Sequence, residues 1–203
     1  MVKARIAVLV SGGGTNLQAL LDAERAGKIP HGEIALVVSN QPGAYALTRA
    51  EQAGVPHVVI TGEQFEKRLM EVLRSAQIDM IILAGFLKIL SADFTGQWPE
   101  RIVNIHPSLI PSFCGEGFYG LHVHEEALRY GVKVTGATVH FVNEVPDGGR
   151  IIAQKAVEVQ PGDTPEILQR RVMEQAEWVL LPQAAEIVAE QLSRTMYSKE
   201  GIF

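Results

Sequence analysis

The stretch VLVSGGGTNLQALL, residues 8–21, decides the fold class of this chain. It starts as an apolar run, breaks at three successive glycines and continues with leucines at helical spacing. A strand, a glycine turn and a helix in this order are the opening unit of a sheet whose strands are joined by helices. Because helix N-termini present unpaired N–H groups and a partial positive charge, the turn is also a candidate anion site.

Short runs rich in Val and Ile recur through the first half of the chain. Their nearly continuous apolarity is typical of strands that are covered on both faces. We expect strands over residues 5–10, 33–39, 57–60 and 79–84, and helices over 15–27, 43–54 and 63–76. This alternation predicts a doubly wound, parallel sheet with right-handed connections.

After residue 100 the pattern changes to a hairpin. RIVNIH, residues 101–106, predicts a fifth strand. Two further strands over 133–142 and 149–159 are separated by NEVPDGG, which is the spacing of a long antiparallel hairpin. The expected fold class is therefore α/β, a Rossmann-like and mostly parallel sheet extended by an antiparallel C-terminal hairpin.

Two helices are expected in the second half, the first over residues 121–131. The last helix begins at GDTPE, where Asp163 or Thr164 can cap it and Pro165 fits the first turn. Pro182 lies inside this last helix, so we expect it to bend or split the helix.

The composition favours a single domain with no nucleic-acid or membrane partner. The 203 residues are 47% hydrophobic, enough to bury one sizeable core. The net charge of −5 comes without a cluster of Lys and Arg that could contact a nucleic-acid backbone. The single cysteine, Cys114, cannot form an internal disulfide, and no apolar run suits a signal peptide or a membrane span. We expect a cytoplasmic protein.

The glycine turn does not match the common nucleotide-binding motifs. A dinucleotide fingerprint needs a third glycine where Leu17 stands, and the second strand ends in SNQPG without an acidic residue for a ribose. A P-loop is excluded because no G-K-[ST] follows. We interpret the turn as a site for a single terminal phosphate, as on a sugar monophosphate, and a tight turn without a ligand stays open as the alternative. The expected phosphate-binding residues are Gly12, Gly13, Gly14, Thr15 and Asn16.

The fifth strand carries a candidate catalytic pair. Asn104 and His106 are two residues apart, so on a strand both side chains point to the same side. Asp147, just before two glycines in the hairpin connection, is either a turn residue or a partner of His106. If the sheet brings it to His106, its carboxylate would orient the imidazole and raise the pKa of His106. Asn104 could then donate a hydrogen bond to a developing oxyanion.

Four stretches together resemble the phosphoribosylglycinamide formyltransferase family: VLVSGGGTNLQAL (8–20), LAGFLKIL (83–90), NIHPSLIPSF (104–113) and TVHFVNEVPDGGRII (138–152). The resemblance implies the formyltransferase fold and a reaction of purine synthesis. In that reaction the formyl group of 10-formyltetrahydrofolate is transferred to the amine of glycinamide ribonucleotide, without a metal. It also implies that Asn104, His106 and Asp147 are the catalytic residues and that GGTN binds the phosphate.

The resemblance assigns further binding residues. It implies that two segments enclose the folate: Phe86, Leu87, Lys88, Ile89 and Leu90 in the first, and Val142, Asn143, Glu144 and Val145 before Asp147 in the second. Without the resemblance, GFLKIL would read as the buried exit of a strand. Glu177 is the expected ligand of the ribose hydroxyls.

The chain also departs from the family pattern. Trp178 stands where many relatives carry histidine, and the spacing between Arg171 and Glu177 is one residue longer, which leaves the register of the last helix open. Lys88 replaces a common arginine. The loop CGEGFYGLHVHEE, residues 114–126, is longer than the family's short form, and we interpret it as a lid. Its histidines, His122 and His124, lack the motif of a zinc site, so no metal is expected.

The resemblance also sets the expected organisation. One formyltransferase domain spans residues 1–190, with a ribonucleotide phosphate-binding half over about 1–100 and a catalytic and folate-binding half over about 101–190. Residues 191–203 form a C-terminal tail whose end, SKEGIF, is expected to fray. A homodimer stays open.

Three alternatives remain at this point. The first is another folate-dependent formyltransferase, such as the one acting on initiator methionyl-tRNA, but its relatives carry an additional basic domain that we do not expect in this acidic chain. The second is a formyltetrahydrofolate hydrolase, whose relatives usually have an additional N-terminal sensing domain. The third is a non-catalytic nucleotide-binding module, against which the set of Asn104, His106 and Asp147 argues.

Overall fold

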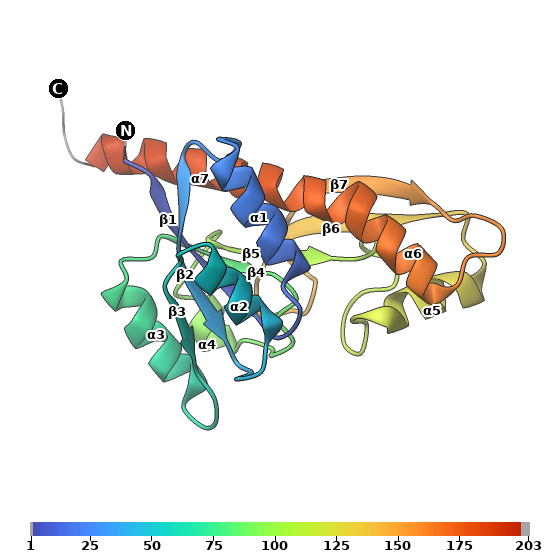
Figure 1. Ribbon diagram of the computed structural model, residues 1–203, viewed down its shortest axis with the longest axis horizontal. Coiled ribbons are helices and arrows are strands. Elements are labelled where there is room, and N and C mark those ends of the chain that lie inside the picture. The colour runs from blue at the N-terminus through green and yellow to red at the C-terminus, as the bar shows by residue number, and fades with distance from the viewer. Residues whose placement is uncertain (1, 200–203) are drawn as a thin grey trace.

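Within residues 2–199, the part of the chain that this computed structural model describes, seven strands form one sheet in the order β3-β2-β1-β4-β5-β6-β7 (Figure 1). The strands are β1 Ala4–Val10, β2 Gly32–Ser39, β3 His57–Val59, β4 Met80–Leu83, β5 Ile102–His106, β6 Val134–Phe141 and β7 Ile151–Glu158. The first five are parallel, whereas β6 runs antiparallel to β5 and β7 antiparallel to β6. The predicted α/β class, a mostly parallel sheet with an antiparallel C-terminal hairpin, is confirmed.

The helices follow the expected alternation. They are α1 Thr15–Arg25, α2 Tyr45–Gln52, α3 Phe65–Ser75, the short α4 Ala92–Thr95, α5 Leu121–Tyr130, α6 Pro165–Val172 and α7 Trp178–Lys199, with a π-helical turn, Met173–Glu177, between the last two. The sequence did not predict α4. None of the helices in the described chain is long and apolar enough to cross a bilayer.

The apolar runs are continuous because the sheet is covered on both faces. Along β1, Ile6 and Val8 pack into the core shared with α1, α2 and α7. Their neighbours Ala7 and Leu9 point to the other face, into the core shared with α3 and α4. Successive strand residues thus enter different cores, and none of the four has more than trace exposure.

The last helix begins as predicted but does not split at Pro182. Thr164 caps α6, because its hydroxyl accepts a hydrogen bond from the Ile167 N–H at 3.3 Å. α7 runs through Pro182, and the irregular segment is the π turn that precedes α7. Pro182 lies near the start of α7, so its missing N–H removes a single hydrogen bond at that end of the helix. α7 continues to Lys199, so residues 191–199 of the expected tail are helical, and residues 200–203 lie outside the described chain.

The strand order creates a crevice at one edge of the sheet. β1 lies between β2 and β4, so the connection after β1 leads to α1 on one face while the connection after β4 leads to α4 on the other. Ligands of open α/β sheets bind at such a switch point, beyond the carboxyl ends of the strands.

Candidate active site

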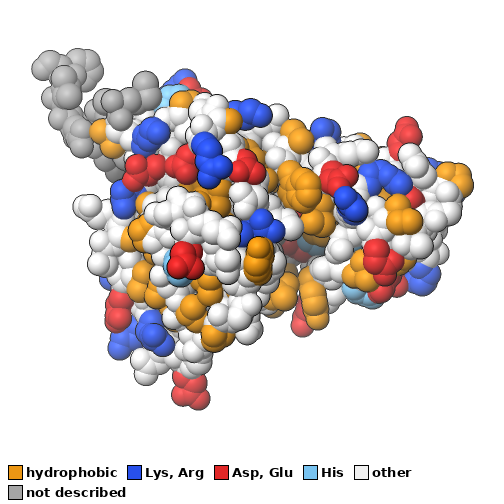
Figure 2. Space-filling model, viewed as in Figure 1, with side chains coloured by type: hydrophobic (Ala, Val, Ile, Leu, Met, Phe, Trp, Pro, Cys, Tyr) orange, Lys and Arg blue, Asp and Glu red, His pale blue; other side chains and the backbone are white. Residues whose placement is uncertain are grey.

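A cavity of about 590 Å³ opens at this switch point. Figure 2 shows the surface hollowed between the part that carries α1 and α2 and the part that carries α5 and α6, with hydrophobic side chains along the hollow. The predicted site residues that line the cavity are Asn16, Phe86, Leu87, Lys88, Ile89, Asn104, His106, Asp147 and Glu177. The structure therefore brings together residues from all parts of the expected site.

Strand pairing positions the catalytic candidates. Asn104 and His106 lie on the same side of β5, and the antiparallel β6 places His140 opposite Asn104 and Thr138 opposite His106. His140 is fully buried, and its Nε2 atom lies 3.1 Å from the amide nitrogen of Asn104. His140 was not predicted from the sequence. The signal was present in TVHFV, because the period of a strand puts His140 on the same face as Thr138.

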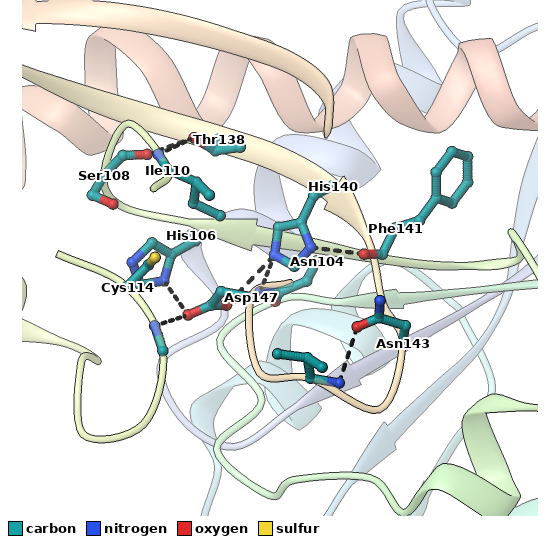
Figure 3. A network of polar contacts seen from close by, with 12 residues as sticks. Asn104, His106, Ser108, Ile110, Cys114, Thr138, His140, Phe141, Asn143 and Asp147 are labelled. Carbon is teal, nitrogen blue, oxygen red and sulfur yellow. Dashed lines mark hydrogen bonds and ion pairs between the residues drawn. The ribbon is translucent and has the colours of Figure 1, made fainter. Parts of the chain in front are cut away.

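The hairpin connection delivers Asp147 to this pair. Asp147 adopts a left-handed conformation with φ of 55°, and the chain turns so tightly behind it that a Cβ on Gly149 would lie 1.7 Å from the carbonyl oxygen of Phe141. Oδ2 of Asp147 accepts a hydrogen bond from the Gly115 N–H at 2.8 Å and lies 3.5 Å from Nδ1 of His106 (Figure 3). The convergence of the histidine and the aspartate that the sequence suggested is thus present.

The other carboxylate oxygen of Asp147 faces the second half of the cluster. Oδ1 lies 3.5 Å from the amide nitrogen of Asn104 and 3.5 Å from Nε2 of His140 (Figure 3). One carboxylate therefore joins Asn104, His106 and His140 into a single polar network.

Backbone carbonyl groups determine where the ring protons lie. Nε2 of His106 is 2.8 Å from the carbonyl oxygen of Phe113, and a carbonyl can only accept, so Nε2 carries the hydrogen. Nδ1 of His106 is then the atom that gains or loses a proton, and it faces Asp147. In the same way, the carbonyl of Phe141 lies 2.8 Å from Nδ1 of His140. This leaves Nε2 of His140 to accept from Asn104.

The pKa of His106 differs in direction from the expectation drawn from the sequence. The charge of Asp147 and the Phe113 carbonyl favour the protonated ring, but desolvation by burial outweighs them and lowers the pKa of His106 below its usual value. Asp147 behaves in the opposite way. Burial alone would raise the pKa of Asp147, but the neighbouring His140 side chain, the charge of His106 and the Gly115 N–H lower it overall.

The glycine turn before α1 is held by α2. The carbonyl of Gly12 accepts a hydrogen bond from the Ala46 N–H at 3.1 Å, and the carbonyl of Gly13 accepts one from Nε of Arg49 at 2.8 Å. Gly14 has a φ of 72°, and a Cβ there would lie 2.6 Å from the Cβ of Ala46. α2 thus takes up the carbonyl groups of the turn and leaves its N–H groups for an anion.

Not every residue expected at the phosphate lines the central cavity. Asn16 does, whereas Gly12, Gly13 and Gly14 form the turn beside it. Thr15 lines a second groove, of about 630 Å³, between α1 and α7. Trp178, the residue after Glu177, also lines this second groove, whereas Glu177 lines the central cavity.

The π turn, Met173–Glu177, brings Glu177 to the central cavity. A π turn holds one more residue than an α turn, which is consistent with the longer spacing after Arg171 that the sequence led us to expect. Glu177 is 7% exposed and lines the cavity, where its Oε2 accepts a hydrogen bond from the side-chain amide of Asn16 at 2.6 Å. Burial raises the pKa of Glu177, and the hydrogen bond from Asn16 opposes this only in part.

A smaller cavity of about 120 Å³ adjoins the first. Of the residues expected around the folate, it is lined by Phe86, Lys88, Ile89, Leu90, Val142, Asn143, Glu144 and Val145, together with Asn104, His140 and Asp147. Leu87 is the exception and lines the larger cavity. Leu87 and Ile89 are 64% and 67% exposed, so the middle of GFLKIL is an exposed loop, whereas Leu90 at its end is buried.

The long loop before α5 covers one side of the larger cavity. Residues 115–120 line it, and Phe118 packs against Phe113 and His122 with ring centroids 6.5 and 5.7 Å apart. His124 is fully buried, and neither of its ring nitrogens has a hydrogen-bond partner. Over residues 2–199 no group of three or more His, Cys, Asp or Glu side chains could hold a metal ion.

The chain is similar to known formyltransferases. Residues 4–184 match the sequence profile of the formyl transferase family. A phosphoribosylglycinamide formyltransferase from Haemophilus influenzae is 43% identical over 177 residues, which cover 84% of this chain and 81% of that protein. A crystal structure of glycinamide ribonucleotide transformylase 1 from Symbiobacterium toebii superposes with a TM-score of 0.86 at 42% identity, covering 93% of this chain and 89% of the other.

A larger protein contains a similar segment. The trifunctional purine biosynthetic protein adenosine-3 of Drosophila melanogaster is 45% identical over 183 residues, which cover 87% of this chain but 13% of that protein. This chain therefore spans a small part of the length of the trifunctional relatives. The profile match and the similarity to proteins of comparable length show that the chain belongs to the formyl transferase family, among relatives named phosphoribosylglycinamide formyltransferase.

Proposed function

We propose that the chain transfers the formyl group of 10-formyltetrahydrofolate to the amine of glycinamide ribonucleotide in purine biosynthesis, giving N-formylglycinamide ribonucleotide and tetrahydrofolate. The observation that carries the proposal is the network of Asn104, His106 and Asp147. It lies in a cavity whose walls also include Asn16 and Glu177 on one side and the loop after β4 on the other. The two substrates would then meet at the network.

The ribonucleotide would lie along α1 and the π turn. Its phosphate would accept hydrogen bonds from the N–H groups of residues 12–16. The carbonyl groups of Gly12 and Gly13 are engaged by α2 and do not face the phosphate. Glu177 would accept hydrogen bonds from the ribose hydroxyls. The buried carboxyl of Glu177 supports this, since among residues 2–199 its one hydrogen bond is the one from Asn16.

The folate ring would enter the small cavity between the loop after β4 and the segment before Asp147. This cavity is narrow, and Ile89 and Val145 among its lining residues are exposed in the free protein. A flat aromatic ring would cover such apolar side chains, and the surrounding backbone groups could bind its polar edge. These features fit the formyl folate as cosubstrate.

In the proposed mechanism His106 acts through Nδ1. As the amine attacks the formyl carbon, the protonated Nδ1 of His106 donates to the oxygen that becomes negative. The amine–carbon bond forms, the bond from carbon to the folate nitrogen breaks, and the proton lost by the amine reaches that nitrogen through Asp147 and a water. Asp147 also stabilises the imidazolium, which burial otherwise disfavours.

Asn104 needs a small rearrangement to take part. Its amide nitrogen points toward His140 at 3.1 Å and toward Asp147 at 3.5 Å. The longer contact is the weaker one, so we propose that Asn104 exchanges Asp147 for the oxyanion during the reaction.

The remaining assignments from the sequence belong to the same proposal. It keeps the division into a phosphate-binding half up to about residue 100 and a catalytic half after it, and it keeps the loop before α5 as a lid. We also propose that the enzyme is cytoplasmic, uses no metal and binds no nucleic acid. A homodimer stays open.

The test is turnover with both substrates and with each omitted in turn. We expect tetrahydrofolate to appear only when glycinamide ribonucleotide is present. His106→Ala should lower the rate on the order of 10²–10³-fold or more without unfolding the protein. His57→Ala, which changes an exposed histidine outside the cavity and the lid, is the matched control. Deformylation without the ribonucleotide would indicate a hydrolase, and no turnover at all would indicate a binding module.

A further inference from the structure

We propose that Ser11 is a positioning residue that couples ribonucleotide binding to folate binding. The inference rests on the proposed function and extends it to a residue with no assigned role. Ser11 directly follows β1 and directly precedes the glycine turn. It therefore lies immediately before the expected phosphate site, which begins at Gly12.

Ser11 holds both ends of a short turn in the loop after β4. Its N–H donates to the carbonyl of Gly85 at 3.1 Å, and its Oγ accepts a hydrogen bond from the N–H of Leu87 at 2.9 Å. We call residues 85–90 the folate loop. The start of the folate loop is thus bonded twice to the residue that adjoins the expected phosphate site.

A third segment orients the Ser11 hydroxyl. Its single hydrogen is donated to Oδ1 of Asn40, 2.7 Å away, just after the end of β2. A hydroxyl that donates in this direction presents its lone pairs to Leu87. Asn40 therefore keeps Ser11 in the rotamer that the folate loop needs.

The start of the folate loop has few other attachments. Leu87 and Ile89 are largely exposed, so packing contributes little at these positions. Phe86 stacks on Phe65 with ring centroids 5.8 Å apart. The far end is held separately, because the N–H of Ser91 donates to Glu66 at 2.7 Å. Loss of the Ser11 hydroxyl would free the start of the folate loop and leave its end in place.

Ser11 also adjoins the expected phosphate site. Ser11 continues into Gly12 and Gly13, where a Cβ would meet no atom within 4 Å, so the turn borders open space in the free protein. A phosphate bound to the N–H groups of this turn would order it, and with it Ser11 and Leu87. Each substrate should then increase the affinity for the other, since coupling between two sites is reciprocal.

The test measures binding without turnover. Tetrahydrofolate carries no formyl group, so its dissociation constant can be measured by titration calorimetry with and without saturating glycinamide ribonucleotide. We expect the ribonucleotide to tighten tetrahydrofolate binding about tenfold in the unmodified protein, the value of one net hydrogen bond. In Ser11→Ala this ratio should fall to about one, whereas Ser11→Thr, which keeps the hydroxyl, should restore it.

Two further variants separate coupling from loop stability. Glu66→Ala removes the carboxylate that accepts hydrogen bonds from the N–H and the hydroxyl of Ser91, and so loosens the far end of the folate loop. It should weaken tetrahydrofolate binding equally with and without the ribonucleotide. Asn40→Leu should reduce the ratio as Ser11→Ala does, while Asn40→Asp, which keeps the acceptor, should preserve it. These variants keep the test decisive even if Ser11→Ala fails to fold.

A ratio of about one in the unmodified protein, or an unchanged ratio in Ser11→Ala or Asn40→Leu, would overturn the inference. Failure of the proposed function would look different. In that case the unmodified protein would bind neither compound, or it would turn over without the ribonucleotide.

Discussion

Asn16 donates a hydrogen bond of 2.6 Å to the carboxyl group of Glu177, a residue 161 positions later in the chain. The bond joins the first turn of α1 to the π turn before α7. Both residues are buried and line the central cavity. The contact therefore closes one end of the site. One side of the Glu177 carboxyl is buried against Asn16, and the other side faces the cavity, where a ligand can reach it.

Glu177→Gln should stabilise the protein and weaken ribonucleotide binding. Burial raises the pKa of Glu177 above that of the unfolded chain, so folded protein holds its proton more tightly and loses stability as pH rises through that window. The neutral glutamine avoids this cost. We expect a higher Tm than that of the unmodified protein at pH of about 8, a smaller difference at about 5, and a rise in the ribonucleotide KM on the order of tenfold. A lower Tm at both pH values would contradict the argument.

Gly13→Ala should weaken ribonucleotide binding without affecting stability. A Cβ at Gly13 meets no protein atom within 4 Å, so it would clash only with a bound phosphate. We expect the ribonucleotide KM to rise on the order of tenfold, with the folate KM changed much less. Gly43→Ala is the matched control, because its Cβ also meets nothing within 4 Å. Equal increases in both KM values would count against a phosphate site here.

Gly14→Ala should instead destabilise the fold. Its Cβ would lie 2.6 Å from that of Ala46, and the φ of 72° is unfavourable for any side chain. We expect a loss of roughly 1–3 kcal/mol in the free energy of unfolding, measured by urea denaturation. A stability equal to that of Gly13→Ala would show that α2 can move away.

Asp147→Asn should lower the pKa of His106 further. The charge of Asp147 is the leading influence that raises this pKa against burial, and the substitution removes it. The ring resonances of His106 in histidine-labelled protein should therefore titrate at lower pH in the variant. The rate at neutral pH should also fall, by on the order of 10²-fold. An unchanged or raised pKa of His106 would refute the electrostatic link between the two side chains.

His124 should make the protein sensitive to mild acid. Desolvation lowers its pKa to about 4 from a usual value of 6.5. The unfolded chain then takes up a proton at a higher pH than the folded chain, and stability falls as pH drops through this range. The full loss is about 3 kcal/mol. His124→Leu should show a flatter dependence of the unfolding free energy on pH, while His122→Leu, at an exposed position on the same helix, should not.

The fold could be predicted from local patterns because each of its strands carries its own signal. Ile6 and Leu9 enter different cores, and a run that is apolar on both faces can be recognised without its neighbours. α4 gave no such signal, since four residues are too few for a helical period. Pro182 does not split the helix, because tolerance of a proline depends on where a helix starts, and here the start is set by the π turn.

The site was predictable to the extent that its residues lie in recognisable motifs. Asn104 and His106 share a strand face, and the two glycines mark the turn at Asp147. His140 and Ser11 were missed for a different reason. Their roles arise from which residue lies opposite or beside them in the sheet, and neither the register of β6 on β5 nor the proximity of Ser11 to Leu87 is visible in one stretch of sequence.

The π turn lets the two helices it joins keep separate buried faces. α6 packs near α5, while α7 lies along α1, and each helix has its own buried face. Because a π turn holds one residue more than an α turn, deleting one residue of it, such as Ala176, would convert it to an α turn with little rotation of either helix. A deletion inside α6 or α7 would instead rotate the rest of that helix by about 100°. Either Leu168 or Leu181 would then leave the core, so the π turn is the place in this segment where a change of length is tolerated best.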